Sequence, residues 1–149
     1  MTKRTATLIV LVAITLIVGV LLFMGAPILS KSLFEEIMIP AGTLITWFGL
    51  IGLPLSIFFG VIEFRKPSNN WFLLLSLLIK TILVLAILWV PISYLLSGSF
   101  AFNFSNTDSF QGGYVAMKIF WYLSYGIAIG SLSVLILYWI SLLVKKVKK

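Results

Sequence analysis

Four long apolar stretches, none of which contains an aspartate or a glutamate, constrain this chain more than any other feature of its sequence. They span residues 5–30, 37–62, 71–96 and 119–144, and each is 26 residues long. A helix of that length reaches about 39 Å, which exceeds the roughly 30 Å hydrocarbon core of a bilayer. Barrel strands would alternate apolar and polar positions, whereas the first stretch is apolar almost throughout. The sequence therefore predicts an all-α, polytopic integral membrane protein in which residues 1–149 form one transmembrane domain.

The composition agrees with lipid as the solvent. The chain is 61% hydrophobic and 10% charged, whereas globular domains are about half apolar and about a quarter charged. A soluble domain of this length could not bury such an apolar excess. The net charge of +7 would suit a nucleic-acid partner, but the basic residues lie mainly at the ends of the apolar stretches. We therefore expect the lipid bilayer, and no nucleic acid, as a partner.

The first stretch also has the basic start of a secretory signal peptide, because Lys3 and Arg4 precede it. Its apolar run is longer than the 7 to 15 residues of a signal core, and residues 23–27 offer no convincing small-x-small cleavage site. We therefore expect a retained helix.

Lysine and arginine residues are distributed unequally between the two sides of the predicted membrane domain. One side receives Lys3, Arg4, Arg65, Lys66, Lys145, Lys146, Lys148 and Lys149, and the other receives Lys31 and Lys118. By the positive-inside rule, the side with more basic residues is cytoplasmic. The distribution predicts a multi-pass protein of the plasma (inner) membrane, with four antiparallel helices in a bundle and both termini in the cytoplasm.

Small residues recur every three or four positions in the second stretch, and two further glycines lie in the fourth. The glycines are Gly42, Gly49, Gly52 and Gly60, followed by Gly126 and Gly130. In lipid, helices associate through van der Waals contact across small residues. We interpret these glycines as packing positions within this bundle, with an oligomer interface as the alternative. Pro54 and Pro91 each remove a backbone donor and should kink the second and third helices.

The segment 97–118 is the one sizeable loop that the sequence predicts outside the membrane. Phe100, Phe102 and Phe104 alternate with other residues in it. This alternation predicts a short strand, or a flap whose phenylalanines enter the membrane interface.

Lys80 is the residue that most invites a functional interpretation. It lies nine positions after Trp71 and nine before Trp89, so about 13.5 Å of helix separates it from each. These tryptophans are expected at opposite membrane boundaries, which places Lys80 near the midplane. A lysine there costs about 2.5 to 3.5 kcal/mol, and such residues usually pair, face a cavity or mark a functional path.

Four explanations of Lys80 remain open at this stage. It can snorkel, or stay deprotonated beside polar neighbours such as Ser76. A carboxylate of a partner subunit can neutralise it. It can form an anion or headgroup site in a transport or lipid-handling cavity. Finally, Ser76 and Lys80 lie one helical turn apart and could act as nucleophile and base, although no other catalytic group accompanies them.

The chain lacks cysteine and histidine, which excludes disulfides, thiol chemistry and imidazole ligands to zinc or haem. No phosphate-binding loop, dinucleotide motif, acid pair or metal-ligand cluster is present either. We therefore expect no catalytic residues, no cofactor and no metal site. The leading hypothesis is a non-enzymatic subunit or accessory of a larger membrane complex, including a transport accessory. The alternative is a small homo-oligomeric channel or carrier for an anionic or lipidic solute, with Lys80, Pro54 and Pro91 along its path.

Overall fold

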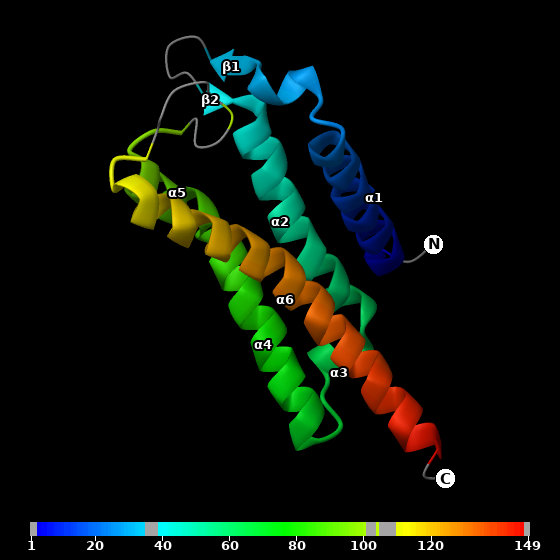
Figure 1. Cartoon of the computed structure of the whole chain (residues 1–149). Helices are drawn as coiled ribbons and strands as arrows, with labels where there is room; N and C mark the ends of the chain where they lie inside the picture. The colour runs from blue at the N-terminus through cyan, green and yellow to red at the C-terminus, as the bar shows by residue number, and fades with distance from the viewer. Residues whose placement is uncertain (1–2, 35–38, 101–103, 105–109, 148–149) are drawn as a thin grey trace.

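The computed structural model describes residues 3–34, 39–100, 104 and 110–147, and it is mostly helical (Figure 1). The long helices are α1 (Lys3–Phe23), α2 (Ala41–Gly60), α4 (Asn70–Ile87) and α6 (Gly113–Val147). The short ones are η1 (Pro27–Ser30), α3 (Ile62–Arg65) and α5 (Trp89–Ser97). All four long helices are long and apolar enough to cross a membrane. The prediction of four long apolar helices packed together is therefore confirmed.

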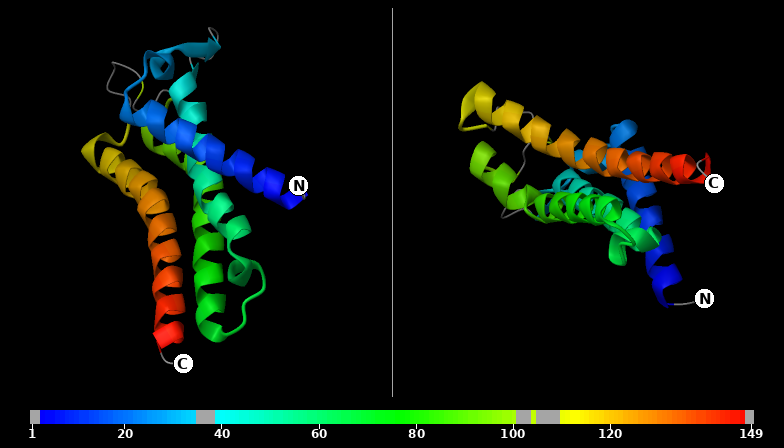
Figure 2. Two further views of the ribbon diagram at one scale, coloured as in Figure 1. Left: turned by 90° about the vertical axis from the view of Figure 1, so that its right-hand side faces the viewer. Right: turned by 90° about the horizontal axis from the view of Figure 1, so that it is seen from below.

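Helix α2 is the centre of the arrangement. It packs against α1, α4 and α6, and α4 and α6 also pack against each other. By contrast, α1 lies mainly against α2. Figure 2 shows that α1 is inclined to the α4 and α6 pair, whereas those two run side by side in opposite directions. The molecule is thus a three-helix bundle with α1 attached to one of its members.

Helix α1 ends at Phe23, seven residues before the predicted boundary at residue 30. Gly25 has a φ of 58°, which is a left-handed conformation that glycine adopts without steric cost. The amides of Ala26 and Gly25 donate to the carbonyls of Leu21 and Leu22, at 3.1 and 3.3 Å. This pair of bonds forms a Schellman motif, and Pro27 follows it where the helix can no longer continue.

The predicted helix 71–96 is two helices in the structure. α4 ends at Ile87 and α5 begins at Trp89, with Leu88 at the break. Because Pro91 has no amide hydrogen, the carbonyl of Ile87 lacks its intrahelical donor. The indole Nε1 of Trp47 donates instead to the carbonyls of Ala86 and Ile87, at 3.1 and 3.2 Å. α2 therefore stabilises the break through one side chain, whereas α2 itself remains one helix across Pro54.

The segments outside the long helices differ from the prediction in two ways. Strands β1 (Ser32–Phe34) and β2 (Ile39–Pro40) pair in antiparallel fashion, so the fold is not strictly all-α. β2 lies within residues 37–62, which were predicted as one helix, and α2 begins only at Ala41. Helix α6 begins at Gly113, within the predicted loop 97–118, and its 35 residues reach about 52 Å. The predicted strand or flap around Phe102 lies outside the described residues, apart from Phe100 and Phe104.

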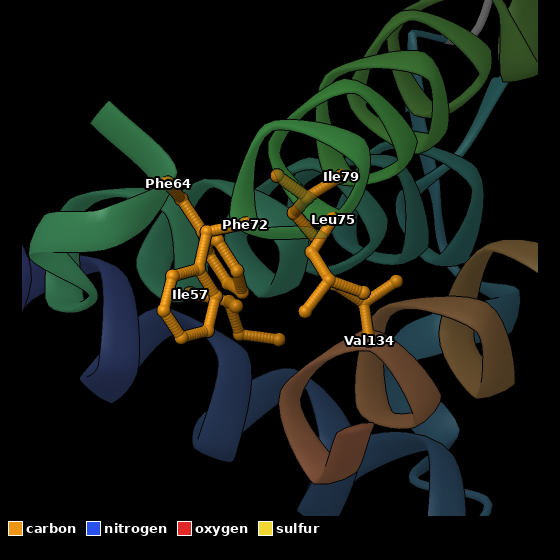
Figure 3. Packing of buried hydrophobic residues seen from close by; sticks show 6 residues of the cluster. All are labelled: Ile57, Phe64, Phe72, Leu75, Ile79 and Val134. Carbon is orange, nitrogen blue, oxygen red and sulfur yellow. The ribbon is translucent and has the colours of Figure 1, made fainter. Parts of the chain in front are cut away.

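Two apolar cores lie at opposite ends of the bundle. The α3-end core consists of Ile57, Phe64, Phe72, Leu75, Ile79 and Val134, which come from α2, α3, α4 and α6 (Figure 3). The α5-end core consists of Ala86, Trp89, Phe120 and Ile127. Asn69 begins α4 at the first of these cores, because its side-chain Oδ1 accepts from the amide of Phe72 at 2.9 Å.

Candidate functional site

Lys80 lies on the outside of the bundle. Its side chain projects from α4 and is exposed, and its Nζ lies 5.8 Å from the centroid of the Phe58 ring of α2. The distance allows a cation–π attraction between the ammonium group and the ring. The lysine therefore faces outward beside Phe58 of α2, and not into the bundle interior.

No carboxylate in the described part of the chain pairs with Lys80. Glu63 is the one acidic residue of that part, and its Oε2 accepts from the amide of Ser68 at 2.8 Å. Glu35, Glu36 and Asp108 lie outside the described residues. Within the described residues, the nearest electrostatic partner that the structure gives Lys80 is thus an aromatic ring.

Ser76, one helical turn before Lys80, connects two helices instead of facing outward. It is completely buried, and its hydroxyl donates to the carbonyl of Phe64 at 2.5 Å. This bond ties α3 to α4. Because the Ser76 hydroxyl is directed to α3 and the Lys80 ammonium to Phe58, the two side chains do not form a hydrogen-bonded pair.

The glycines of α2 face α1 and the segment that follows it. A Cβ at Gly49 would lie 2.4 Å from Cγ1 of Val18, and one at Gly52 would lie 2.9 Å from Oγ1 of Thr15. A Cβ at Gly60 would make ordinary contact with Leu8. Larger residues at the first two positions would push α1 away, so these glycines set how closely α1 approaches α2. At the other end of α2, a Cβ at Gly42 would lie 2.8 Å from the carbonyl oxygen of Leu29 and 2.6 Å from Cδ1 of Phe104.

The two glycines of α6 differ from each other. A Cβ at Gly130 would lie 3.3 Å from Cδ1 of Ile82, so Gly130 packs against α4. Gly126 is exposed, and nothing within the described part of the chain lies within 4 Å of the corresponding position. The expectation that Gly126 packs within this bundle is therefore not met, because this position of α6 points away from the other helices.

A cavity of about 540 Å³ lies where α1 and α6 diverge. Its residues come from the end of α1 and η1 on one side, from α6 on the other, and from α2 and the start of α5 between them. The described ones are Leu22, Gly25, Ala26, Leu29, Ser30, Thr46, Leu50, Trp89, Phe104, Phe120, Trp121, Ser124, Tyr125 and Ala128. None of these carries a charge, and neither Lys80 nor Pro91 is among them.

The polar groups in the cavity wall are hydroxyls and indoles. Trp89 Nε1 donates to the hydroxyl of Ser124 at 2.8 Å, and Ser124 donates in turn to the carbonyl of Phe120. The Oγ1 atom of Thr46 is buried and has no hydrogen-bond partner among the described residues. A buried hydroxyl without a partner is costly, so Thr46 is an unsatisfied polar group in the cavity wall.

Sequence reasoning missed this cavity as a site. It placed Trp89 at a membrane boundary and did not connect it with residues of the second and fourth helices. The spacing of Trp121 and Tyr125, one helical turn apart, is the signal that could have indicated a shared aromatic face. Their rings stack with centroids 5.3 Å apart and an interplanar angle of 17°.

The described residues contain no group of three or more acidic, histidine or cysteine side chains that could hold a metal ion. Two candidate sites therefore remain, the exposed Lys80 ammonium group near the expected midplane and the aromatic cavity, whose described lining residues are uncharged. No protein-family model matches the chain, and no curated protein or solved structure is detectably similar to it.

Proposed function

We propose that this chain is a non-enzymatic subunit of a larger membrane complex and that Lys80 contacts a carboxylate of a partner subunit. In this proposal the protein crosses the plasma (inner) membrane four times, with both termini in the cytoplasm. The observation that carries it is the position of the Lys80 ammonium group on the outer surface of the bundle. A partner can reach that surface without any rearrangement of the chain.

The energetic argument depends on depth. Lys80 lies about 13.5 Å along the helix from Trp71, close to half the thickness of a 30 Å hydrocarbon core. A lysine at that depth costs about 2.5 to 3.5 kcal/mol, and the contact with Phe58 returns about 0.5 to 2 kcal/mol. A carboxylate at the same depth on a partner helix would offset the remainder. The competing explanation is a snorkelling lysine, which needs no partner and for which substitution by leucine would be harmless.

The charge distribution supports the orientation. The end of α2, the start of α4 and the end of α6 point to the end of the bundle that carries Arg65, Lys66, Lys145 and Lys146, and the start of α1 lies beside the end of α2. Arg4 Nη2 donates to the carbonyl of Phe59 at 2.9 Å and so ties the start of α1 to the end of α2. A cation at a helix C-terminus is favourable. This basic end is the one that the positive-inside rule assigns to the cytoplasm.

The test is the size of the assembly in native cells. The tagged chain would be extracted in a mild detergent and its mass and subunit stoichiometry measured by native mass spectrometry. We expect a complex of fixed stoichiometry that Lys80→Leu disrupts and Lys80→Arg preserves, because arginine keeps the charge. Thr81→Leu is the matched control, since Thr81 is exposed at the next position of the same helix and bonds only its own helix, at the carbonyl of Leu77.

Two results would overturn the proposal. One is a homogeneous species that contains this polypeptide alone, with Lys80→Leu unchanged in assembly. The other is selective flux of an anionic or lipidic solute through liposomes that contain the purified chain, lost in Lys80→Leu. The second result would favour the homo-oligomeric channel or carrier.

A further inference from the structure

The cavity between α1 and α6 has the size and the wall chemistry of a binding site. Its 540 Å³ fall within the range of about 300 to 1,000 Å³ that is usual for small-molecule sites. Such sites are mostly apolar and contain a few polar groups that orient the ligand. Because α1 lies mainly against α2, the α1 side of the cavity is not closed by contact with α6. A molecule dissolved in the bilayer could therefore enter from the side.

The wall chemistry disfavours a charged ligand. The described lining residues include no lysine, arginine, aspartate or glutamate, so a phosphate or carboxylate group would lose its hydration without gaining a counter-ion. Among the described lining residues, none would hold the charged headgroup of an ordinary phospholipid. The ligand that fits is electrically neutral.

The aromatic content favours a flat ring over a plain acyl chain. Five aromatic side chains line the cavity, namely Trp89, Phe104, Phe120, Trp121 and Tyr125. The rings of Trp121 and Tyr125 stack on each other, and those of Trp89 and Phe120 are tilted with their centroids 5.7 Å apart, so the wall contains rings in more than one orientation. A planar ring gains from offset stacking and edge contacts of this kind, beyond the area that it buries.

Thr46 supplies the polar element. Its Oγ1 is buried without a partner, and its residue forms part of the cavity wall. Rotation about the Cα–Cβ bond exchanges the hydroxyl with the methyl group, which lets the hydroxyl bond a ligand in the cavity. The wall is aromatic, its described residues carry no charge, and Thr46 offers a hydroxyl. We infer that the cavity binds a neutral, membrane-dissolved molecule with a planar ring. This ring carries a carbonyl or hydroxyl oxygen, which is the chemistry of a quinone or its reduced phenol form.

The experiment uses the full-length chain in phosphatidylcholine nanodiscs and decylubiquinone as the probe. Trp89 and Trp121 line the cavity, so bound quinone should quench tryptophan fluorescence in a saturable way, above the linear collisional background. The second arm measures how well decylubiquinol, the reduced form of the probe, competes with decylubiquinone for the site. The ratio of the two apparent Kd values shows whether the cavity prefers the carbonyl or the hydroxyl form.

Two classes of variant locate the site. Thr46→Val keeps the shape of the side chain and removes the hydroxyl, and it should weaken the apparent Kd about 5- to 10-fold, as expected for one lost hydrogen bond. Ala128→Phe fills the cavity from α6 and should abolish the saturable quenching. Leu22→Phe fills it from α1 without adding a tryptophan to the fluorescence signal, and it gives a second variant in case the first does not fold. Thr81→Val is the matched control, because it removes an exposed hydroxyl outside the cavity, and it should leave the Kd unchanged.

The inference is overturned if quenching never saturates, or if it saturates equally in Thr46→Val and in a folded cavity-filling variant. It is also overturned if tetradecanol displaces decylubiquinone as well as a ring-bearing competitor does, because the cavity would then select apolar volume alone. None of these outcomes depends on whether Lys80 has a partner subunit, so the test is independent of the proposed function.

Discussion

The two ends of the bundle are built in different ways. At the α3 end, the chain turns back after α2 and inserts Phe64 among α2, α4 and α6, and Phe64, Phe72, Leu75 and Ile79 are all fully buried. At the α5 end, the helices are interrupted: α4 gives way to α5 at Leu88, and α1 ends in a turn at Gly25. A cavity of about 540 Å³ takes the place of side chains there.

The two ends of the bundle therefore differ in what they contribute: the α3 end contributes mainly packing, and the α5 end contains the cavity. The α3-end core joins four helices, and the Ser76 bond to Phe64 closes it with a polar contact. The α5-end core also joins α2, α4, α5 and α6, but it leaves a space beside Trp89 and Phe120. In lipid such a space costs less than in water, because a membrane-dissolved molecule can occupy it. Changes at the α3 end should affect stability, and changes around the cavity should affect its shape and occupancy.

Gly49→Leu should have the largest effect on this comparison. A Cβ at Gly49 would already lie 2.4 Å from Val18, so leucine must displace α1, at a cost of about 3 kcal/mol, the upper end for overpacking. Because α1 lies mainly against α2, we expect α1 to detach and the cavity to lose a wall, while the α3-end core stays intact. The measure is crosslinking of Leu8→Cys to Gly60→Cys by a short bis-maleimide, since the chain contains no other cysteine.

Gly19→Leu is the control for this experiment. Gly19 lies on α1, and nothing within the described residues lies within 4 Å of where its Cβ would be. Crosslinking should persist in this variant and fall sharply in Gly49→Leu. Equal crosslinking in both variants would show that α1 is not positioned by the close approach at Gly49.

Phe72→Ala should have the second largest effect, at the opposite end. The Phe72 ring is fully buried, contacts the Tyr138 ring at a centroid distance of 5.7 Å and has the Lys145 ammonium 4.2 Å from its centroid. We expect a loss of about 2 kcal/mol in reversible unfolding in mixed micelles. This is below the 3 to 5 kcal/mol typical of a water-soluble core, because lipid removes most of the transfer term and leaves the lost packing. Leu73→Ala, on an exposed neighbour, should cost less than 0.5 kcal/mol.

The fold could be predicted from the sequence where one local signal decided it. Long apolar stretches specify helices whatever their neighbours, because an unpaired backbone group in lipid is costly. The end of α1 was missed although Gly25 and Pro27 gave a usable stop signal, since hydropathy alone does not register a turn. The break at Leu88 also has a local cause in Pro91, but the donor that stabilises it, Trp47, lies about 40 positions away in the chain.

The candidate sites could be predicted only in part. The depth of Lys80 follows from its distance to Trp71 and Trp89, but the direction of its side chain depends on how α2 and α4 pack. Counting along one helix could not distinguish its exposed position from the buried position of Ser76 one turn away. The cavity was beyond prediction, because it forms only where α1, α2, α5 and α6 meet at particular angles, and no single segment carries its pattern.

Trp47→Phe should have the smallest of the three effects, and it tests whether the α5 end is shaped by the break at Leu88. Phenylalanine keeps an aromatic ring at this position but has no N–H group that could donate to the carbonyls of Ala86 and Ile87. We expect a loss of about 1 kcal/mol in reversible unfolding, the usual range for one interhelical hydrogen bond in a membrane protein. Trp139→Phe, at an exposed position of α6, is the matched control and should be neutral.

A double-mutant cycle with Pro91→Ala makes this last prediction specific. Alanine restores the amide hydrogen that proline lacks, so the carbonyl of Ile87 regains an intrahelical donor and α4 can continue into α5. In that background the Trp47 indole becomes redundant, and Trp47→Phe should cost less than half of what it costs in the native chain. An equal cost in both backgrounds would mean that Trp47 contributes through packing of its ring, and that the break at Leu88 does not depend on the donor that Ile87 loses at Pro91.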